Sequence, residues 1–266
     1  MKASITISSR EFKIDFSQAH DISIPIKFNG EQPNTYGVDI ATAKPYRDDN
    51  FVGDTREGGP CNFETYSITP HCNGTHTESI GHITKERVSI LSSLKDVMIP
   101  STLISLVPKS SFDSYKPTLN KADLVISKQD IYELIDNTPS YLLEALIIRT
   151  HPNKDIKKSQ NYMKSLPSFF SIDAMKYIKS KGVKHLLVDI PSVDRLFDEG
   201  NLSAHNIFWD TIDKKFNPLT KNHTITEMIF VDNTIVDGSY LLNLQIPAFI
   251  ADAAPSRPII FKLYDI

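Results

Sequence analysis

The chain has 266 residues, of which 40% are hydrophobic and 23% are charged, and its formal net charge at pH 7 is −3. This balance supports a packed core and excludes the disordered and fibrous classes of protein. The absence of a basic surplus also argues against nucleic acid or an anionic membrane as a partner.

The N-terminus lacks the apolar run of a signal peptide, and no stretch is long and apolar enough to span a membrane. The two cysteines, Cys61 and Cys72, are too few to hold a secreted scaffold of this size together. We therefore expect a cytoplasmic protein that forms a single domain over residues 1–266.

Short strands separated by turn-forming residues are expected in the first hundred positions. Residues 22–26 and the alternating run 62–69 have the character of strands, whereas residues 28–34 and 54–60 are rich in turn formers and predict loops. Residues 101–107 follow as a more buried strand.

Helices are expected only after residue 120. Residues 121–126 predict a strand that leads into a helix capped by Ser127, with Asp130 three residues later. Ser171 could cap a second helix, which would end near Gly182. Further buried strands are predicted within residues 142–149, 183–190, 224–232, 240–244 and 258–263. This order of elements predicts a mixed α/β domain built on a mixed sheet.

A histidine-rich stretch carries the first sign of chemistry. His76 and Glu78 are two residues apart, so their side chains share a face wherever the chain is extended. An imidazole nitrogen and a carboxylate oxygen together suit a divalent metal such as Zn²⁺ or Mn²⁺. Cys72 has the same parity in an extended chain and His71 the opposite one, although Gly74 allows a kink between them. The alternative is a set of scattered polar residues on a surface strand.

His82 lies six residues beyond His76, and the intervening Ser-Ile-Gly lets the chain turn back toward it. A histidine held beside a metal site without binding the ion suits general acid or base catalysis, because its ordinary pKa is near 6.5. We expect structural or solvated roles for the histidines outside this stretch that have no neighbouring ligands, namely His20, His151, His185 and His223.

Residues 74–82, Gly-Thr-His-x-Glu-x-x-x-His, resemble the His-x-Gly-Thr-His-x-Asp-x-Pro-x-His signature of the putative cyclase family. That family includes bacterial metal-dependent kynurenine formamidases and isatin hydrolases. Residues 21–26 (DISIPI) are similar to its opening strand, and residues 187–194 (LVDIPSVD) to its Pro-Ser-Val-Asp block. His205 and Glu227 lie where the family has a metal-binding histidine and glutamate.

The resemblance implies a role for each matching residue. His76 would bind a first metal, Glu78 would lie between two metals, His205 and Glu227 would bind the second, and His82 would act as the acid and base. It also implies one or two divalent ions per chain. We expect zinc, with manganese as the alternative, because of a cysteine in the histidine-rich stretch. The implied fold is the swivelling β/β/α kind, a mixed sheet partly rolled into a barrel with flanking helices. The implied assembly is a homodimer or homotetramer with exchanged N-terminal segments.

The chain also departs from the signature. Cys72 stands where the family has its first histidine, and we expect it to be a ligand whose thiolate would favour zinc. A register shift that places His71 on the metal is the main rival, and Cys72 could instead stay a buried thiol. Glu78 replaces an aspartate, Ile80 replaces a proline, and residues 206–223 resemble an insertion that could reshape the pocket or a subunit contact.

These features predict a metal-dependent amidohydrolase that cleaves an N-formyl group, as an arylformamidase does, or a cyclic amide. The expected partner is a small-molecule amide, and His82 would pass a proton to the leaving nitrogen. Phe208 and Trp209 would either line the pocket of an aryl substrate or pack in the core. The alternatives are a metal- or ligand-binding member that has lost catalysis, and a biosynthetic cyclase that uses the same site.

Overall fold

The computed structural model describes residues 1–266, and its centre is one mixed sheet of eleven strands. In order of pairing, the strands are β1 (Lys2–Ile7), β2 (Arg10–Asp15), β15 (Ile259–Asp265), β13 (Gly238–Asn243), β7 (Met98–Leu106), β9 (Ala145–Thr150), β11 (His185–Val188), β12 (Thr224–Glu227), β6 (His76–Ser79) and β14 (Ala253–Pro255), with β3 (His20–Asp21) also paired to β15. Two separate pairs are β8 (Val125–Ile126) with β10 (Phe169–Phe170), and β4 (Thr42–Pro45) with β5 (Glu64–Ser67).

Parallel pairing within this sheet is confined to its middle. The strands β7, β9, β11 and β12 run parallel to one another, and the outer strands are antiparallel to their neighbours. Every residue of β9, β11 and β12 is buried. Burial on both faces is typical of parallel strands covered by other elements, so the prediction of a mixed α/β domain is confirmed.

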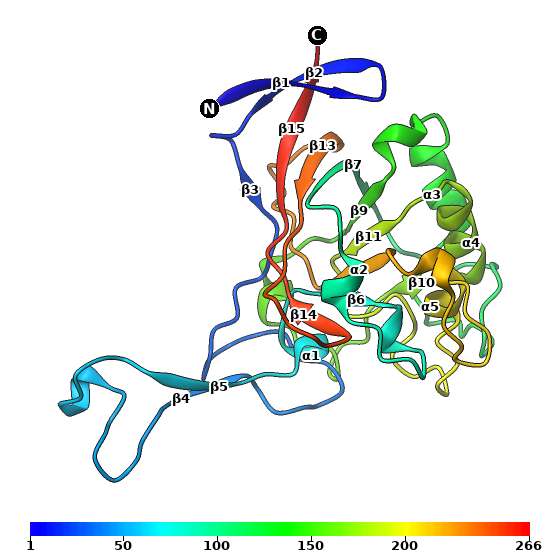
Figure 1. The fold of residues 1–266 in the computed structure, drawn as a ribbon. Helices are drawn as coiled ribbons and strands as arrows, with labels where there is room; N and C mark the ends of the chain where they lie inside the picture. Colours follow the sequence, from blue (N-terminus) through cyan, green and yellow to red (C-terminus); the bar gives the residue numbers. More distant parts are fainter.

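Helices cover one face of the parallel strands (Figure 1). They are α3 (Lys128–Ile135), α4 (Ile172–Ser180) and α5 (Ser203–Phe208). The remaining helical segments are the single turns α1 (Pro70–Asn73) and α2 (Ile90–Ser93) and the 3-10 helices η1 (Thr55–Glu57), η2 (Ile80–His82), η3 (Ser140–Leu142), η4 (Asp155–Ser159) and η5 (Pro218–Thr220). None of the helices has the length and apolar character needed to cross a bilayer.

The predicted helix boundaries are confirmed by their caps. Ser127 and Asp130 form a reciprocal capping box at the start of α3. The Ser171 hydroxyl accepts the Ala174 N–H at 2.9 Å and so caps α4. Gly182 follows α4 with a φ of +80°, which a residue with a side chain rarely adopts.

The core is divided between the two faces of the sheet. On β9, Leu146 and Ile148 pack under the helices, whereas Ala145 and Ile147 belong to a second cluster on the opposite face. That second cluster also contains Tyr240 of β13. The core on the face away from the helices therefore spans both the parallel and the antiparallel half of the sheet.

Two predicted strands differ from the structure for local reasons. Residues 22–26 form only an isolated bridge at Ser23, because Pro25 has no N–H and the Ile24 N–H donates to the Thr75 hydroxyl at 2.8 Å. The strand predicted over residues 224–232 ends at Glu227, because Met228 takes a φ of +54° and turns the chain.

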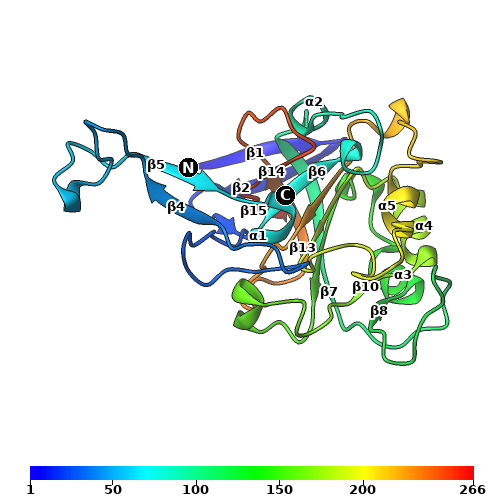
Figure 2. The ribbon, with the colours of Figure 1, turned by 90° about the horizontal axis from the view of Figure 1, so that it is seen from below.

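The pair β4–β5 forms an arm that projects from the body of the molecule (Figures 1 and 2). The strand predicted in residues 62–69 is confirmed as β5, although all of its residues are exposed. At the base of the tip, the Tyr46 and Phe63 rings lie 5.1 Å apart, and Phe51 packs against both. The predicted loop 54–60 forms part of this tip and contains η1.

His185 gives the fold a defined response to acid. The residue is fully buried on β11, with Nδ1 2.9 Å from the Thr224 hydroxyl and Nε2 without a hydrogen-bond partner. Burial lowers the pKa of His185 to about 4, so the folded protein takes up this proton at lower pH than the unfolded chain. The stability that His185 contributes is therefore complete above pH 6.5 and is lost as the pH falls toward 4.

We expect urea unfolding to show this loss. Between pH 7 and pH 5, the free energy of unfolding should fall by about 2 kcal/mol more in the wild type than in His185→Gln. The glutamine keeps a polar partner for Thr224 but does not titrate. Equal losses in the two proteins would show that His185 is not the responsible group.

Candidate metal centre

Strand pairing brings the predicted site residues together. β6 lies between β12 and β14, with His76 directly opposite Glu227 and Glu78 directly opposite Ala253. Ile225, two residues before Glu227, packs in the core beneath the helices. Because side chains two residues apart share a face, His76, Glu78 and Glu227 all point toward the helix-covered side of the sheet.

His205 reaches the same point from α5. Its Nε2 atom lies 3.1 Å from Glu78 Oε1 and 3.8 Å from Glu227 Oε1. His76 Nε2 lies 3.5 Å from Glu227 Oε2, and His82 Nε2 lies 3.7 Å from Glu78 Oε2. Five of the six site residues proposed from the sequence thus form one cluster, although they come from three separate parts of the chain.

Cys72 is the sixth, and its neighbourhood differs from the expectation. Residues 70–73 form the helical turn α1, so the parity of an extended chain does not apply before Gly74. His71 turns toward Glu78 instead, with Nδ1 3.1 Å from Glu78 Oε2. Burial and the nearby Glu227 carboxylate raise the pKa of Cys72 to about 11, which favours a neutral thiol.

Three groups of side chains have ligand atoms that all lie within 4.8 Å of one another. They are His71 with His76 and Glu78, Glu78 with His82 and His205, and His71 with His82 and Asp252. Cys72 and Glu227 belong to none of them, and His71 belongs to two. The geometry thus brings His71 to Glu78, as the shifted register requires.

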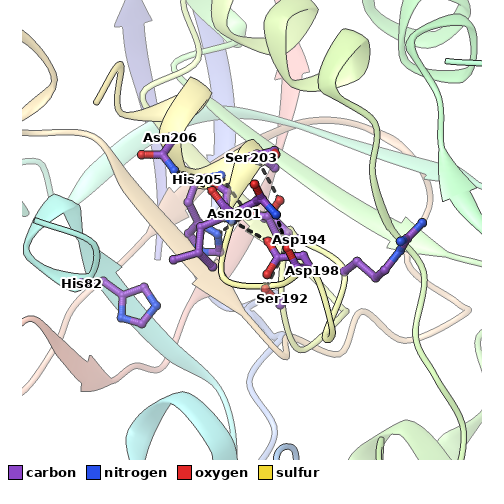
Figure 3. A network of polar contacts seen from close by, with 12 residues as sticks. His82, Ser192, Asp194, Asp198, Asn201, Ser203, His205 and Asn206 are labelled. Atoms are coloured by element: carbon purple, nitrogen blue, oxygen red, sulfur yellow. Dashed lines mark hydrogen bonds and ion pairs between the residues drawn. The ribbon is translucent and has the colours of Figure 1, made fainter. Parts of the chain in front are cut away.

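Hydrogen bonds orient the two most buried imidazoles. His76 Nδ1 lies 3.0 Å from the Gly74 carbonyl oxygen, and His205 Nδ1 lies 2.7 Å from Asp194 Oδ2. Both partners accept hydrogen bonds only, so each Nδ1 carries a proton and each Nε2 is the nitrogen that faces the cluster. Figure 3 shows Asp194 beside His205, with His82 across from them on a separate segment.

The Pro-Ser-Val-Asp block after β11 holds both Glu227 and His205 in place. The Val193 N–H donates to Glu227 Oε1 at 2.9 Å. Asp194 accepts from the Tyr115 hydroxyl at 2.9 Å and from the Ala204 N–H at 2.7 Å, in addition to His205. The sequence marked this block as a family motif, but its positioning role is visible only in the folded chain.

The residues present fit a divalent cation. His76 Nε2 and Glu78 Oε2 are buried and have no hydrogen-bond partner, even though other site atoms are close. An orphaned buried lone pair is costly unless it is satisfied, and an ion at this point would satisfy both atoms. Imidazole nitrogen and carboxylate oxygen are ligands that zinc and manganese accept.

The electrostatic field of the cluster favours positive charge. Burial alone would raise the pKa of Glu78, but His82, His205 and His71 hold it well below its ordinary value. Burial alone would lower the pKa of His205, but Asp194 and Glu78 raise it well above its ordinary value. In the same way, contacts with Asp252 and Glu78 raise the pKa of His71 to about 10 against the effect of burial. The cluster thus attracts either protons or a cation.

Asp252 is the site residue that sequence reasoning missed. Its Oδ2 atom lies 3.0 Å from His71 Nε2 and 3.6 Å from His82 Nδ1. It precedes β14 and is brought beside β6 by strand pairing alone. No spacing or motif in the sequence connects it with residues so far upstream.

Two aromatic residues near His205 pack in the core. Phe208 and Trp209 are fully buried and belong to the cluster beneath the helices. The Trp209 indole N–H donates to the His223 carbonyl at 3.0 Å. Of the two alternatives for these residues, core packing is confirmed. The segment 206–223 forms the end of α5 and a loop that contains η5.

Comparison with known proteins identifies the same family that the sequence resembles. A family model described as "Putative cyclase" matches residues 14–195, which is more than half of the chain. No curated protein sequence matches the chain.

Several solved structures have the same fold. One described as a potential metal-dependent hydrolase with cyclase activity has a TM-score of 0.61 and 17% identity, covering 92% of this chain and 97% of the other. A predicted metal-dependent hydrolase from Bacillus stearothermophilus has a TM-score of 0.60 and 17% identity, with 92% and 98% coverage. An isatin hydrolase bound to the product analogue thioisatinate has a TM-score of 0.61 and 13% identity, with 92% coverage of both chains. At these identities the likeness establishes the fold.

Proposed function

The chain belongs to the putative cyclase family, and from that premise we propose that it is a metal-dependent hydrolase that cleaves a carbon–nitrogen amide bond. The observation that carries the proposal is the convergence of His76, Glu78, His205 and Glu227 around buried atoms that lack partners. The names of similarly folded proteins, two metal-dependent hydrolases and an isatin hydrolase, support the same reaction class.

We assign the ligands as two overlapping sets. His71, His76 and Glu78 would hold one ion. Glu78, His205 and Glu227 would hold another, and either zinc or manganese accepts these nitrogen and oxygen ligands. A bound divalent ion supplies Lewis acidity, which polarises a carbonyl and makes water a stronger nucleophile.

His82 is suited to move the proton in this reaction. Its side chain is 29% exposed, so it lies between the buried cluster and solvent. A Cβ on the preceding Gly81 would lie 2.1 Å from the Val88 carbonyl oxygen, so the turn that aims His82 admits only glycine. His82 would accept a proton from the attacking water and deliver it to the leaving nitrogen.

The substrate we propose is an N-formyl arylamine or a cyclic amide. The family resemblance supports the first, and the similarly folded isatin hydrolase supports the second. A biosynthetic cyclase could use the same cluster, but a purely metal-binding protein would not need His82 beside it. Both cysteines are free thiols, which is in keeping with the cytoplasmic location that we propose.

Zinc binding should distinguish His71 from Cys72. We expect His71→Ala to weaken zinc affinity at least tenfold, because it removes an imidazole that faces Glu78. The matched variant Cys72→Ala should keep the affinity of the wild type. Competition with a chromophoric chelator measures both, and loss of zinc in Cys72→Ala alone would make Cys72 the ligand.

Activity can be tested on two probes, N-formylkynurenine and isatin. We expect hydrolysis of at least one, loss of activity after chelation, and recovery with zinc or manganese. His82→Ala should lower kcat at least 100-fold, as expected for loss of a general acid and base, while metal content stays unchanged.

His20→Ala is the control for a histidine outside the cluster and should keep full activity. Failure of the metal-loaded wild type on both probes would contradict the proposed substrates. A near-normal rate in His82→Ala would contradict its assigned role.

We also propose that the chain forms a homodimer or homotetramer through the β4–β5 arm. An isolated two-stranded hairpin is marginally stable in water, and this one exposes Tyr46, Phe63 and Tyr66. The arm leads into α1, which carries His71, so a subunit contact there would lie close to the metal cluster.

Sedimentation velocity should show an oligomer for the wild type and a shift toward monomer for Phe63→Ser. Phe112→Ser removes a more fully exposed aromatic ring outside the arm and should leave the oligomer intact. A monomeric wild type at micromolar concentration would contradict this proposal.

A further inference from the structure

Asp252 borders the candidate metal centre on its outer side, and hydrogen bonds fix the backbone of this residue. The Asp252 carbonyl oxygen accepts from the Ser79 N–H at 2.9 Å and from the Ser79 hydroxyl at 3.1 Å. The next residue, Ala253, is paired with Glu78 across β14 and β6. These contacts hold position 252 at a set distance from the strand that carries His76 and Glu78.

One oxygen of this carboxylate faces two imidazoles. Asp252 Oδ2 lies at hydrogen-bond distance, 3.0 Å, from His71 Nε2 and at ion-pair distance, 3.6 Å, from His82 Nδ1. The two rings stack with centroids 4.2 Å apart and planes inclined by 28°. His82 is therefore held both by the charge of Asp252 and by the ring that Asp252 fixes.

We propose that Asp252 is a positioning residue that sets the roles of His71 and His82 from a single carboxylate oxygen. The inference rests on the proposed function and deepens it. A carboxylate accepts hydrogen bonds only, so His71 turns its Nε2–H toward Asp252, and the negative charge of Asp252 favours an N–H at Nδ1 of His82. His71 then presents Nδ1 to Glu78 as a ligand atom, and His82 presents Nε2 to the cluster as a base.

His71 needs such a partner because of where it sits. His76 lies on a strand inside the sheet, whereas His71 lies on α1, a single helical turn of four residues. A single turn gives little orientation to a side chain that is 25% exposed. Asp252, the residue just before β14, supplies for His71 the restraint that the strand supplies for His76.

Two other features bear on this assignment. Arg87 is the other charged group near Asp252, but its guanidinium is 4.0 Å from Oδ1 and 82% exposed, so it leaves Oδ2 to the histidines. The atoms of His71, His82 and Asp252 could also be read as a separate metal site. That reading requires His71 to bind ions through both ring nitrogens at once, which makes the positioning role the simpler one.

The test uses the full-length zinc-loaded protein and the near-isosteric variant Asp252→Asn. We expect zinc affinity to fall about 10- to 100-fold, as for loss of a carboxylate behind a metal-bound histidine. We also expect the ring nitrogen signals of His71 and His82 to change in long-range ¹H–¹⁵N NMR spectra, because the amide no longer selects one tautomer. The rate of hydrolysis of N-formylkynurenine or isatin, whichever the wild type cleaves, should also fall.

Asp21→Asn is the matched control. Asp21 accepts from Arg257 at 2.7 Å, so its loss removes an ion pair from the segment just after β14 without touching the histidines. Zinc affinity and histidine signals should match the wild type in this variant. Urea unfolding of both variants confirms that the fold is kept.

Other results would overturn the inference. Wild-type affinity together with unchanged tautomers in Asp252→Asn would show that Asp252 does not position the histidines. A zinc ion beyond two per wild-type chain that disappears in Asp252→Asn would make Asp252 a ligand. A wild type that binds no zinc or manganese would overturn the proposed function itself, and this inference with it.

Discussion

The pairing of β6 with β12 and β14 is the constraint on which the candidate site depends. It places His76 opposite Glu227 and Glu78 opposite Ala253. A slip of one residue would turn every side chain of β6 to the other face and disperse the cluster. On that other face, the hydroxyls of Thr77 and Thr226 lie 2.8 Å apart and help to fix the register. The candidate metal site thus depends on a strand register inside the sheet.

The cluster concentrates charged groups that would be costly to bury alone, and a neighbour supports each of them. The Gly74 carbonyl orients His76, Asp194 orients His205, and the Val193 N–H holds one oxygen of Glu227. Such outer contacts fix tautomers and raise the basicity of ligands. The inner half of the site is therefore rigid, whereas His71 and His82 lie on short turns near solvent.

Two departures from the family signature, Glu78 and Ile80, lie at the candidate site. The glutamate at position 78 is one methylene longer than aspartate, and its two oxygens each lie 3.1 Å from a different histidine, His205 on one side and His71 on the other. His71 reaches Glu78 from the helical turn α1. Next to Ile80, which stands where the signature has a proline, the backbone of Gly81 approaches that of Val88 closely.

Local signals in the sequence determined the caps of α3 and α4, the buried central strands, and the shared face of His76 and Glu78, because capping and strand periodicity act over a few residues. The family resemblance named His205 and Glu227, which no spacing argument reaches. Only the tertiary structure shows that His71 lies beside Glu78, since the helical turn α1 breaks the parity of an extended chain. It also supplied Asp252, because only the pairing of β14 with β6 joins segments so distant in sequence.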